Sequence, residues 1–346
     1  MSQEPPAFAW PAASATGVGS MPGTDPAEAI AVVLGELPDL PHLPELPGRG
    51  VGADLTGRTA AMLVDVPVET TAGGWKLAAR PGRDQRRAAG FLAADLDAAQ
   101  EAAGEWAGAF KIQVCGPWTL AATVELPRSQ NPALADPGAV ADLTASLAEG
   151  VAAHVAEVRA RISGAEVLLQ LDEPALPAVL AGAVPTASGL NRVGAIDTAV
   201  TRDGLRAVLA ATTAFGLVHC CAPDIPFGLL REAGARAVAF DLGLLRRGEE
   251  DALAEVVEAG LGVLAGAAAV PSRTGSPGPG PAIQIVTRVT DLWHRMGIPA
   301  AGLDRQVVFT PACGLAGASP SGARAALARC REAARLLPEL IEEGTA

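Results

Sequence analysis

The sequence predicts an α/β protein built as a single (β/α)8 TIM barrel, and three features of its pattern favour this fold. Short apolar segments alternate with longer amphipathic segments over most of the chain. The short segments are almost continuously apolar, as in parallel strands that are covered on both faces. Polar side chains follow directly after several of these segments, where a barrel carries its functional residues.

In chain order, a first strand is expected at Thr16–Ser20 and another within the Gly/Pro-rich region 36–56. Six further strands are expected at Ile112–Cys115, Val167–Leu171, Gly216–Cys220, Ala237–Asp241, Gly262–Ala265 and Val307–Thr310. Helices are expected at 87–108, 139–162, 203–213, 226–234, 249–259, 282–296 and 321–342. Their apolar residues recur at helical spacing, as in the stripe Leu143, Leu147, Val151 and Val155.

The domain organisation follows from the same pattern. Residues 1–15 are expected to form a flexible N-terminal arm, and residues 16–346 a single barrel. The stretch Ser272–Pro281, SRTGSPGPGP, is interpreted as a long loop between a strand and a helix rather than as a linker between domains.

Composition excludes several classes of function. The net charge of −12 disfavours binding to nucleic acid or to an anionic membrane surface. No apolar run is long enough for a membrane span, and no secretory signal is visible at the start. Five cysteines, an odd number, indicate a reducing cytoplasm in which thiols are available as ligands. The chain has no tyrosine, and its only lysines are Lys76 and Lys111, so Schiff-base chemistry has few candidates.

The segment VHCCAPD, residues 218–224, is the first candidate for chemistry. His219 and Cys221 are two positions apart at a strand end, so they point to the same side, whereas Cys220 points away. Imidazole and thiolate suit zinc, and Cys313 in FTPACGLAG offers a further soft ligand from another strand end. A His-x-Cys pair by itself is more often a pair of buried core residues.

The segment LLQLDEPAL, residues 168–176, places two carboxylates directly after an apolar strand. Asp172 and Glu173 point in opposite directions, so one faces the barrel mouth while the other caps or pairs. Recognition of an ammonium group by Asp172 and a helix N-cap ahead of Pro174 are equally compatible with the pattern.

Two glycine-containing turns complete the set. In ATGVGSMPGTD, residues 15–25, backbone N–H groups and the Ser20 hydroxyl are available to an anion such as a carboxylate. The motif is neither a Walker loop nor a dinucleotide fingerprint, and a plain tight turn also explains it. In QVCGPWTLA, residues 113–121, Trp118 is a candidate pocket wall or a packing residue.

In this order the motifs resemble the catalytic C-terminal half of cobalamin-independent methionine synthases. The resemblance runs from TGVGSMPGT through GPWTL, QLDEPAL and HCC to ACGLAG, with QLDEPAL the most specific. Next in specificity is His-x-Cys followed by Cys-Gly-Leu, with Cys313 92 positions after Cys221. The family is a TIM barrel in the superfamily that also holds uroporphyrinogen decarboxylases.

The resemblance implies a site for zinc and homocysteine. His219, Cys221 and Cys313 match the family's zinc ligands, and Asp241 lies where the family carries a Glu as the fourth. Asp172 would hold the substrate amino group and Ser20 its carboxylate. The family's second amino-group carboxylate falls in GRGVGADLTGR, where Asp54 is the acidic residue. Homocysteine would bind zinc as a thiolate and attack a methyl group.

Two departures from the family bear on the methyl donor. The long N-terminal barrel of the full-length enzymes is missing, and GAAAVPS follows Gly262–Ala265 where the family carries Asp-x-His. A methyltetrahydrofolate donor needs its departing nitrogen protonated, whereas a methylcorrinoid does not. The sequence therefore suggests methylcobalamin, on a partner corrinoid protein, as the donor. The alternatives are methylation of another small thiol, or a non-catalytic barrel that binds zinc or an amino acid.

Overall fold

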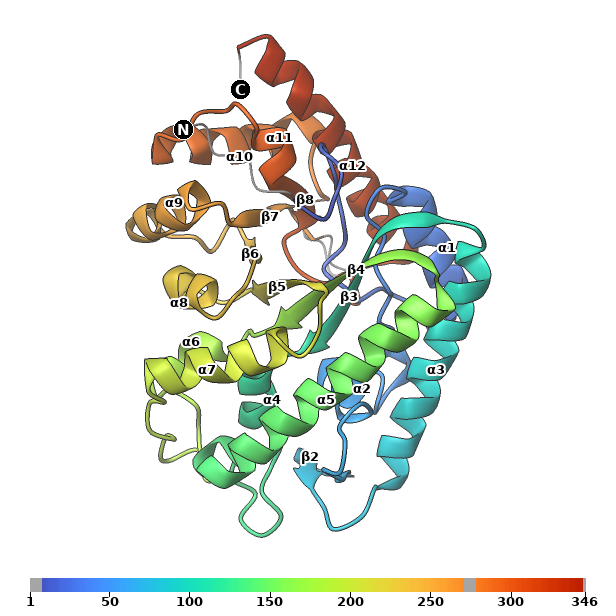
Figure 1. The fold of residues 1–346 in the computed structure, drawn as a ribbon, viewed down its shortest axis with the longest axis vertical. Helices are drawn as coiled ribbons and strands as arrows, with labels where there is room; N and C mark the ends of the chain where they lie inside the picture. Colours follow the sequence, from blue (N-terminus) through green and yellow to red (C-terminus); the bar gives the residue numbers. More distant parts are fainter. Residues whose placement is uncertain (1–7, 271–277, 345–346) are drawn as a thin grey trace.

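The computed structural model describes residues 8–270 and 278–344 and shows a curled parallel sheet surrounded by helices (Figure 1). Six parallel strands follow one another in the order β3-β4-β5-β6-β7-β8. Their bounds are β3 Ala107–Cys115, β4 Gly164–Asp172, β5 Phe215–Cys220, β6 Ala237–Asp241, β7 Gly262–Ala268 and β8 Val307–Pro311. All six strands predicted from the apolar runs are confirmed.

The helices that follow the strands lie on the outside of the sheet (Figure 1). They are α4 Pro117–Thr123, α5 Pro137–Arg161, α6 Leu176–Leu180, α7 Thr198–Leu209, α8 Phe227–Glu232, α9 Glu250–Glu258, α10 Ala282–Met296, α11 Leu303–Gln306 and α12 Pro320–Glu342. The helix α3 Arg83–Ala103 precedes β3. On α5, Leu143, Leu147, Val151 and Val155 are buried, as their helical spacing predicts.

The gap between β8 and β3 is closed by two irregular segments rather than by strands. Ala15 forms a parallel bridge with Phe309 of β8, Ser20 with Glu45, and His42 with Lys111 of β3. These contacts place residues 15–20 and 42–45 where a barrel has its first two strands. The α/β fold is therefore confirmed, whereas a full set of eight strands is not shown within the described residues.

The segment before β3 holds elements that the sequence pattern does not predict. These are α1 Pro26–Glu36, α2 Leu55–Ala60 and an antiparallel hairpin of β1 Val68–Thr71 and β2 Gly74–Leu77. Asp25 caps α1 by accepting hydrogen bonds from Ala27 N and Glu28 N.

The barrel interior changes from apolar to polar along the strands. At the amino ends, a cluster that includes Leu168, Phe215, Leu217 and Ala237 is closed by Trp10. Trp10 is 6% exposed, and its Nε1 donates a hydrogen bond to Arg305 O. Within the segment expected to form a flexible arm, Trp10, Ser14 and Ala15 are buried and Pro11 and Ala12 are exposed, whereas residues 1–7 lie outside the described residues.

The predicted long loop Ser272–Pro281 is largely outside the described residues, which resume at residue 278. Across the described ranges, none of the helices has the length and apolar character that a membrane span requires.

Candidate metal and substrate site

A cavity of roughly 240 Å³ opens at the carboxyl ends of the strands. Its walls come from β4, β5, the segment after β8, and the two irregular segments that close the barrel. The lining residues are Val18, Gly19, Ser20, Glu45, Pro47, Leu55, Asp172, Pro174, His219, Cys221, Cys313 and Gly314. Five of the residues predicted from the sequence, Ser20, Asp172, His219, Cys221 and Cys313, thus meet in one cavity.

His219 is held in a fixed orientation by the neighbouring strand. Its Nδ1 lies 2.7 Å from Asp172 Oδ1, which also accepts a hydrogen bond from Gln170 Nε2 at 2.7 Å. The register pairs Asp172 of β4 directly with His219 of β5, so both side chains point into the barrel. This contact leaves His219 Nε2 buried and without a hydrogen-bond partner in the described part of the chain.

Cys221 and Cys313 come from different strand ends and both line the cavity. The hydrogen bond from the Cys221 thiol lowers the pKa of Cys313 to about 6, and the Gly314 N–H also favours the Cys313 thiolate. The same interaction raises the pKa of Cys221. The neighbourhood of the two sulfurs therefore favours the thiolate form of Cys313 over that of Cys221.

The donor set suits zinc in its chemistry. An imidazole nitrogen and two cysteine sulfurs are typical zinc ligands. A carboxylate on the other ring nitrogen, as Asp172 provides, is the usual support for a histidine that binds metal. Within the described residues, however, no three His, Cys, Asp or Glu side chains are already arranged around one metal position.

Glu45 is a cavity residue that the sequence does not reveal. It is 4% exposed, and Arg58 Nε lies 3.6 Å from its Oε1. Burial raises the pKa of Glu45 to about 7, against the opposing effect of Arg58. Its segment carries no strand pattern, and the only signal is an acidic residue within the Leu- and Pro-rich segment LPHLPEL, residues 40–46. Glu45 and Asp172 together give the cavity two carboxylates.

Glu173 has a different role from its neighbour Asp172. Its carboxylate is buried and accepts hydrogen bonds from Trp118 N at 2.9 Å and from both Thr119 N and Oγ1 at 2.7 Å. It therefore caps the first turn of α4, on the side of the strand opposite to Asp172. The prediction that one carboxylate faces the mouth while the other caps a helix describes this arrangement, although the capped helix is α4 rather than α6.

Three other residues predicted for the site do not line the cavity. Asp54 Oδ1 accepts a hydrogen bond from Gly57 N at 2.8 Å and caps α2. Trp118 is 1% exposed, and its Nε1 donates to Thr201 O at the contact between α4 and α7. Asp241 Oδ1 accepts from Gly243 N at 2.7 Å, within its own turn. In each case a local hydrogen bond or packing contact occupies the side chain.

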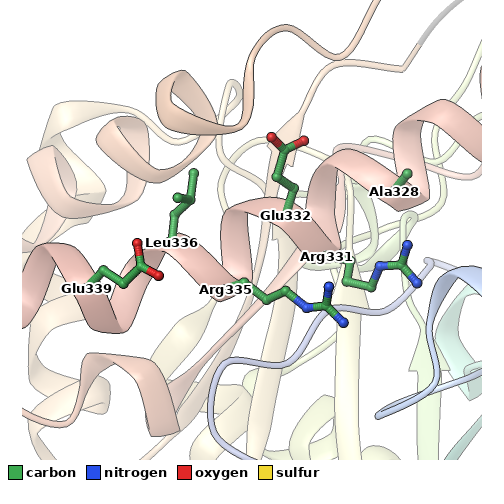
Figure 2. A pocket seen from close by; sticks show the side chains of 6 residues that line it. All are labelled: Ala328, Arg331, Glu332, Arg335, Leu336 and Glu339. Atoms are coloured by element: carbon green, nitrogen blue, oxygen red, sulfur yellow. The ribbon is translucent and has the colours of Figure 1, made fainter.

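A further cavity lies on the outer face of α12, and all six of its lining residues come from that helix (Figure 2). Arg331 and Arg335 point to the side of the helix opposite to Glu332. Arg331 is already engaged, because it donates a hydrogen bond to Gly35 O. The barrel mouth, where potential ligands converge from separate strands, is therefore the candidate site.

Comparison with known proteins gives one family match for the chain. The family described as "Cobalamin-independent synthase, Catalytic domain" matches residues 131–336, which is more than half of the chain. No curated protein matches the chain significantly. Because the family is cobalamin-independent, the match does not support the methylcobalamin or corrinoid-protein donor that the sequence suggested.

Among solved structures, the chain is similar to a B12-independent methionine synthase from Shewanella sp. W3-18-1 in complex with selenomethionine. The TM-score is 0.65 at 12% identity, with 96% of this chain and 100% of that chain covered. A GH5_18 protein from Streptomyces cattleya in complex with GlcNAc matches at 14% identity and a TM-score of 0.44, covering 96% of this chain and 81% of that chain. At 12% identity, the similarity to the Shewanella structure shows a shared fold and no more.

Proposed function

The chain belongs to the cobalamin-independent synthase family, and from this premise we propose that it is a zinc-dependent methyltransferase that converts homocysteine to methionine. The observation that carries the proposal is the convergence of His219, Cys221 and Cys313 on one cavity with Asp172 and Ser20. This set combines soft metal ligands with groups that complement the two charged ends of an amino acid.

We propose that His219 Nε2, Cys221 and Cys313 hold the zinc ion. Asp172 supports this assignment, because its contact with Nδ1 keeps the other ring nitrogen directed away from β4. Asp241 is the candidate fourth ligand, and to serve as one it must release Gly243 N. When bound, zinc lowers the pKa of a thiol ligand and so supplies a thiolate nucleophile at neutral pH.

The amino acid part of homocysteine fits the remaining groups of the cavity. In the described part of the chain, the hydrogen bonds of the Asp172 carboxylate all go to Oδ1, which leaves Oδ2 for the substrate ammonium. Glu45 is the proposed second carboxylate for this ammonium, in place of Asp54. Ser20, beside the glycine-rich turn, is proposed to bind the substrate carboxylate.

Three finer features belong to the same proposal. Residues 15–20 and 42–45 serve as the first two positions of a closed eight-position barrel. The cysteines work as reduced thiols in the cytoplasm. The methyl donor is a molecule other than cobalamin, such as methyltetrahydrofolate, the donor that the family resemblance implies.

The test is formation of methionine from homocysteine and methyltetrahydrofolate by the purified protein, measured by mass spectrometry. His219→Ala should reduce the rate at least about a hundredfold, because it removes a metal ligand. His294→Ala, on the outer helix α10, is the matched control and should keep full activity. Equal rates in the two variants would contradict the assigned site.

A second candidate function is a barrel that binds zinc or an amino acid without catalysis. It is favoured by the absence of His and Asp from GAAAVPS, after β7, where the family carries Asp-x-His. Zinc-loaded protein that binds methionine but forms none with methyltetrahydrofolate would support this function. Methylation of a different small thiol in the same assay would identify another acceptor.

A further inference from the structure

The turn that carries Ser20 is held in place by two side chains from the barrel interior. The main-chain oxygen of Val18 accepts a hydrogen bond from Lys111 Nζ at 2.9 Å and another from Gln170 Nε2, also at 2.9 Å. Lys111 lies on β3 and Gln170 on the adjacent strand β4. Two donors from neighbouring strands therefore converge on one carbonyl, two residues before Ser20.

Both donors are in an unusual place for polar side chains. Lys111 is fully buried, and Gln170 is 1% exposed. Burial of an ammonium group is costly unless its protons are bonded and its charge is balanced. Here Nζ bonds Val18 O and Gln113 Oε1, and the charges of Asp172 and Glu45 oppose the fall in the Lys111 pKa that burial causes.

Only a few main-chain hydrogen bonds hold this turn. Gly19 O accepts from Glu45 N at 3.1 Å, Met21 N donates to Glu45 O at 2.8 Å, and Ser20 O accepts from Leu315 N at 2.8 Å. The first two form one isolated bridge, and the segment pairs with its neighbours only through such isolated bridges. The bonds to Val18 O thus add a side-chain support where a regular strand would have a continuous ladder.

The glycines on either side of Val18 allow the turn to lie close to the interior side chains. A Cβ at Gly17 would stand 2.2 Å from His42 Cε1, and one at Gly19 would stand 2.8 Å from Gln113 Cγ. The turn therefore rests directly on the interior layer that contains Lys111 and Gln113, and its position depends on that layer.

We propose that Lys111 and Gln170 are positioning residues that fix Ser20 for recognition of the substrate carboxylate, with the Val18 carbonyl as their shared point of attachment. The inference rests on the proposed function, in which Ser20 binds that carboxylate. Lys111 does not touch the substrate in this scheme. A hydroxyl recognises a carboxylate well only when it is held within a few tenths of an ångström, and the turn lacks a strand ladder to hold it there.

The two positioning residues differ in one testable respect. Gln170 Nε2 also bonds Asp172 Oδ1, so its loss affects the ammonium end of the ligand as well. Lys111 acts on the carboxylate end through Val18, and removing its positive charge does not weaken attraction of an ammonium group. Lys111→Met should therefore weaken recognition of the carboxylate without weakening recognition of the ammonium group, whereas Gln170→Leu should weaken both.

The experiment is calorimetric titration of the purified protein with two ligands, L-methionine and 3-(methylthio)propylamine, which lacks only the carboxylate. In Lys111→Met we expect the dissociation constant of methionine to rise about tenfold, the loss typical of one hydrogen bond to a charged group. Binding of the amine should not weaken. Lys111→Gln, which retains a hydrogen-bond donor, should restore part of the preference for methionine over the amine. Lys76→Met is the control at the only other lysine.

Gly19→Ala provides a second route if Lys111→Met does not fold. The added methyl group meets Gln113 and displaces the same turn, so it should also weaken the binding of methionine more than the binding of the amine. Gly90→Ala, where a Cβ meets nothing within 4 Å, is its control. Equal weakening of both ligands, or no change in either, would overturn the positioning role. A wild-type protein that binds neither ligand would instead overturn the proposed function, and the positioning role with it.

Discussion

At the scale of single residues, the two carboxylates of the cavity, Asp172 and Glu45, lie next to basic side chains. Arg58 of α2 lies beside Glu45 and is also paired with Asp95. Its positive charge favours the carboxylate form of Glu45, against the effect of burial.

The pH dependence of binding should report on Glu45. Its pKa is raised to about 7, so the carboxylate form is lost as the pH falls below 7. Because the substrate ammonium needs the carboxylate, the affinity for methionine should rise between pH 5.5 and 7 and then level off. The slope should approach about one logarithmic unit per pH unit below 7.

Calorimetric titrations of the wild type and of Glu45→Gln across this range provide the measurement. The variant should bind more weakly at pH 7.5 and should lose the part of the pH dependence that Glu45 contributes. Arg58, Lys111 and Asp172 face Glu45 and are unchanged in the variant, so the difference between the two profiles isolates one group. Parallel profiles would show that Glu45 does not bind the ligand.

Sequence reasoning placed a residue in the cavity correctly where no local hydrogen bond competes for its side chain. His219, Cys221 and Asp172 follow apolar strands, and their positions in the cavity were predictable from strand alternation. Asp241 also ends a strand, but its carboxylate bonds Gly243 N, and Asp54 caps a short helix instead of lining the cavity. Glu45 was not predictable, because the segment around it has neither strand nor helix periodicity.

At the scale of elements, Glu173 joins β4 to α4 through three hydrogen bonds to one carboxylate. Pro117 starts that helix, and the Trp118 ring packs against α7, where a Cβ at Gly204 would stand 2.7 Å from it. The motifs GPWTL and QLDEPAL, which are far apart in sequence, therefore form one structural unit. Its function is to fix the strand end that presents Asp172.

Glu173→Ala should destabilise the protein by about 2–4 kcal/mol, because it leaves the buried N–H groups of Trp118 and Thr119 without an acceptor. Urea denaturation monitored by tryptophan fluorescence would measure the change. Glu166→Ala on the same strand is the matched control, since Glu166 is exposed and should change stability by less than about 0.5 kcal/mol. A loss as small as that control's would rule out the capping role.

Element positions were predictable where the hydrophobic period was clear. All six strands of the sheet and the long outer helices lie within a few residues of their expected places. The sequence pattern missed the shorter elements, because they lie in the Gly/Pro-rich part of the chain or beside it, or are too short to show a helical period. These are α1, α2, α4, α6, α11 and the β1–β2 hairpin. Their form depends on caps such as Asp25 and on tertiary contacts rather than on a repeating pattern.

At the scale of the whole molecule, the barrel is apolar at the amino ends of its strands and polar at their carboxyl ends. Trp10 and Phe215 close the first end with an edge-to-face contact, and the cavity opens at the second. This polarity explains why ligands that are distant in sequence meet. Sequence order alone could predict the convergence, but not which acidic residues would be free to take part in it.

The central claim is that strand ends from across the barrel form one zinc site, and zinc content tests it most directly. Protein purified under reducing conditions without added metal should carry about one zinc per chain. Cys313→Ser should lose most of it, whereas Cys330→Ser, a buried cysteine of α12, should retain it. Wild-type protein without zinc, or a Cys313→Ser variant that keeps a full complement, would contradict the account.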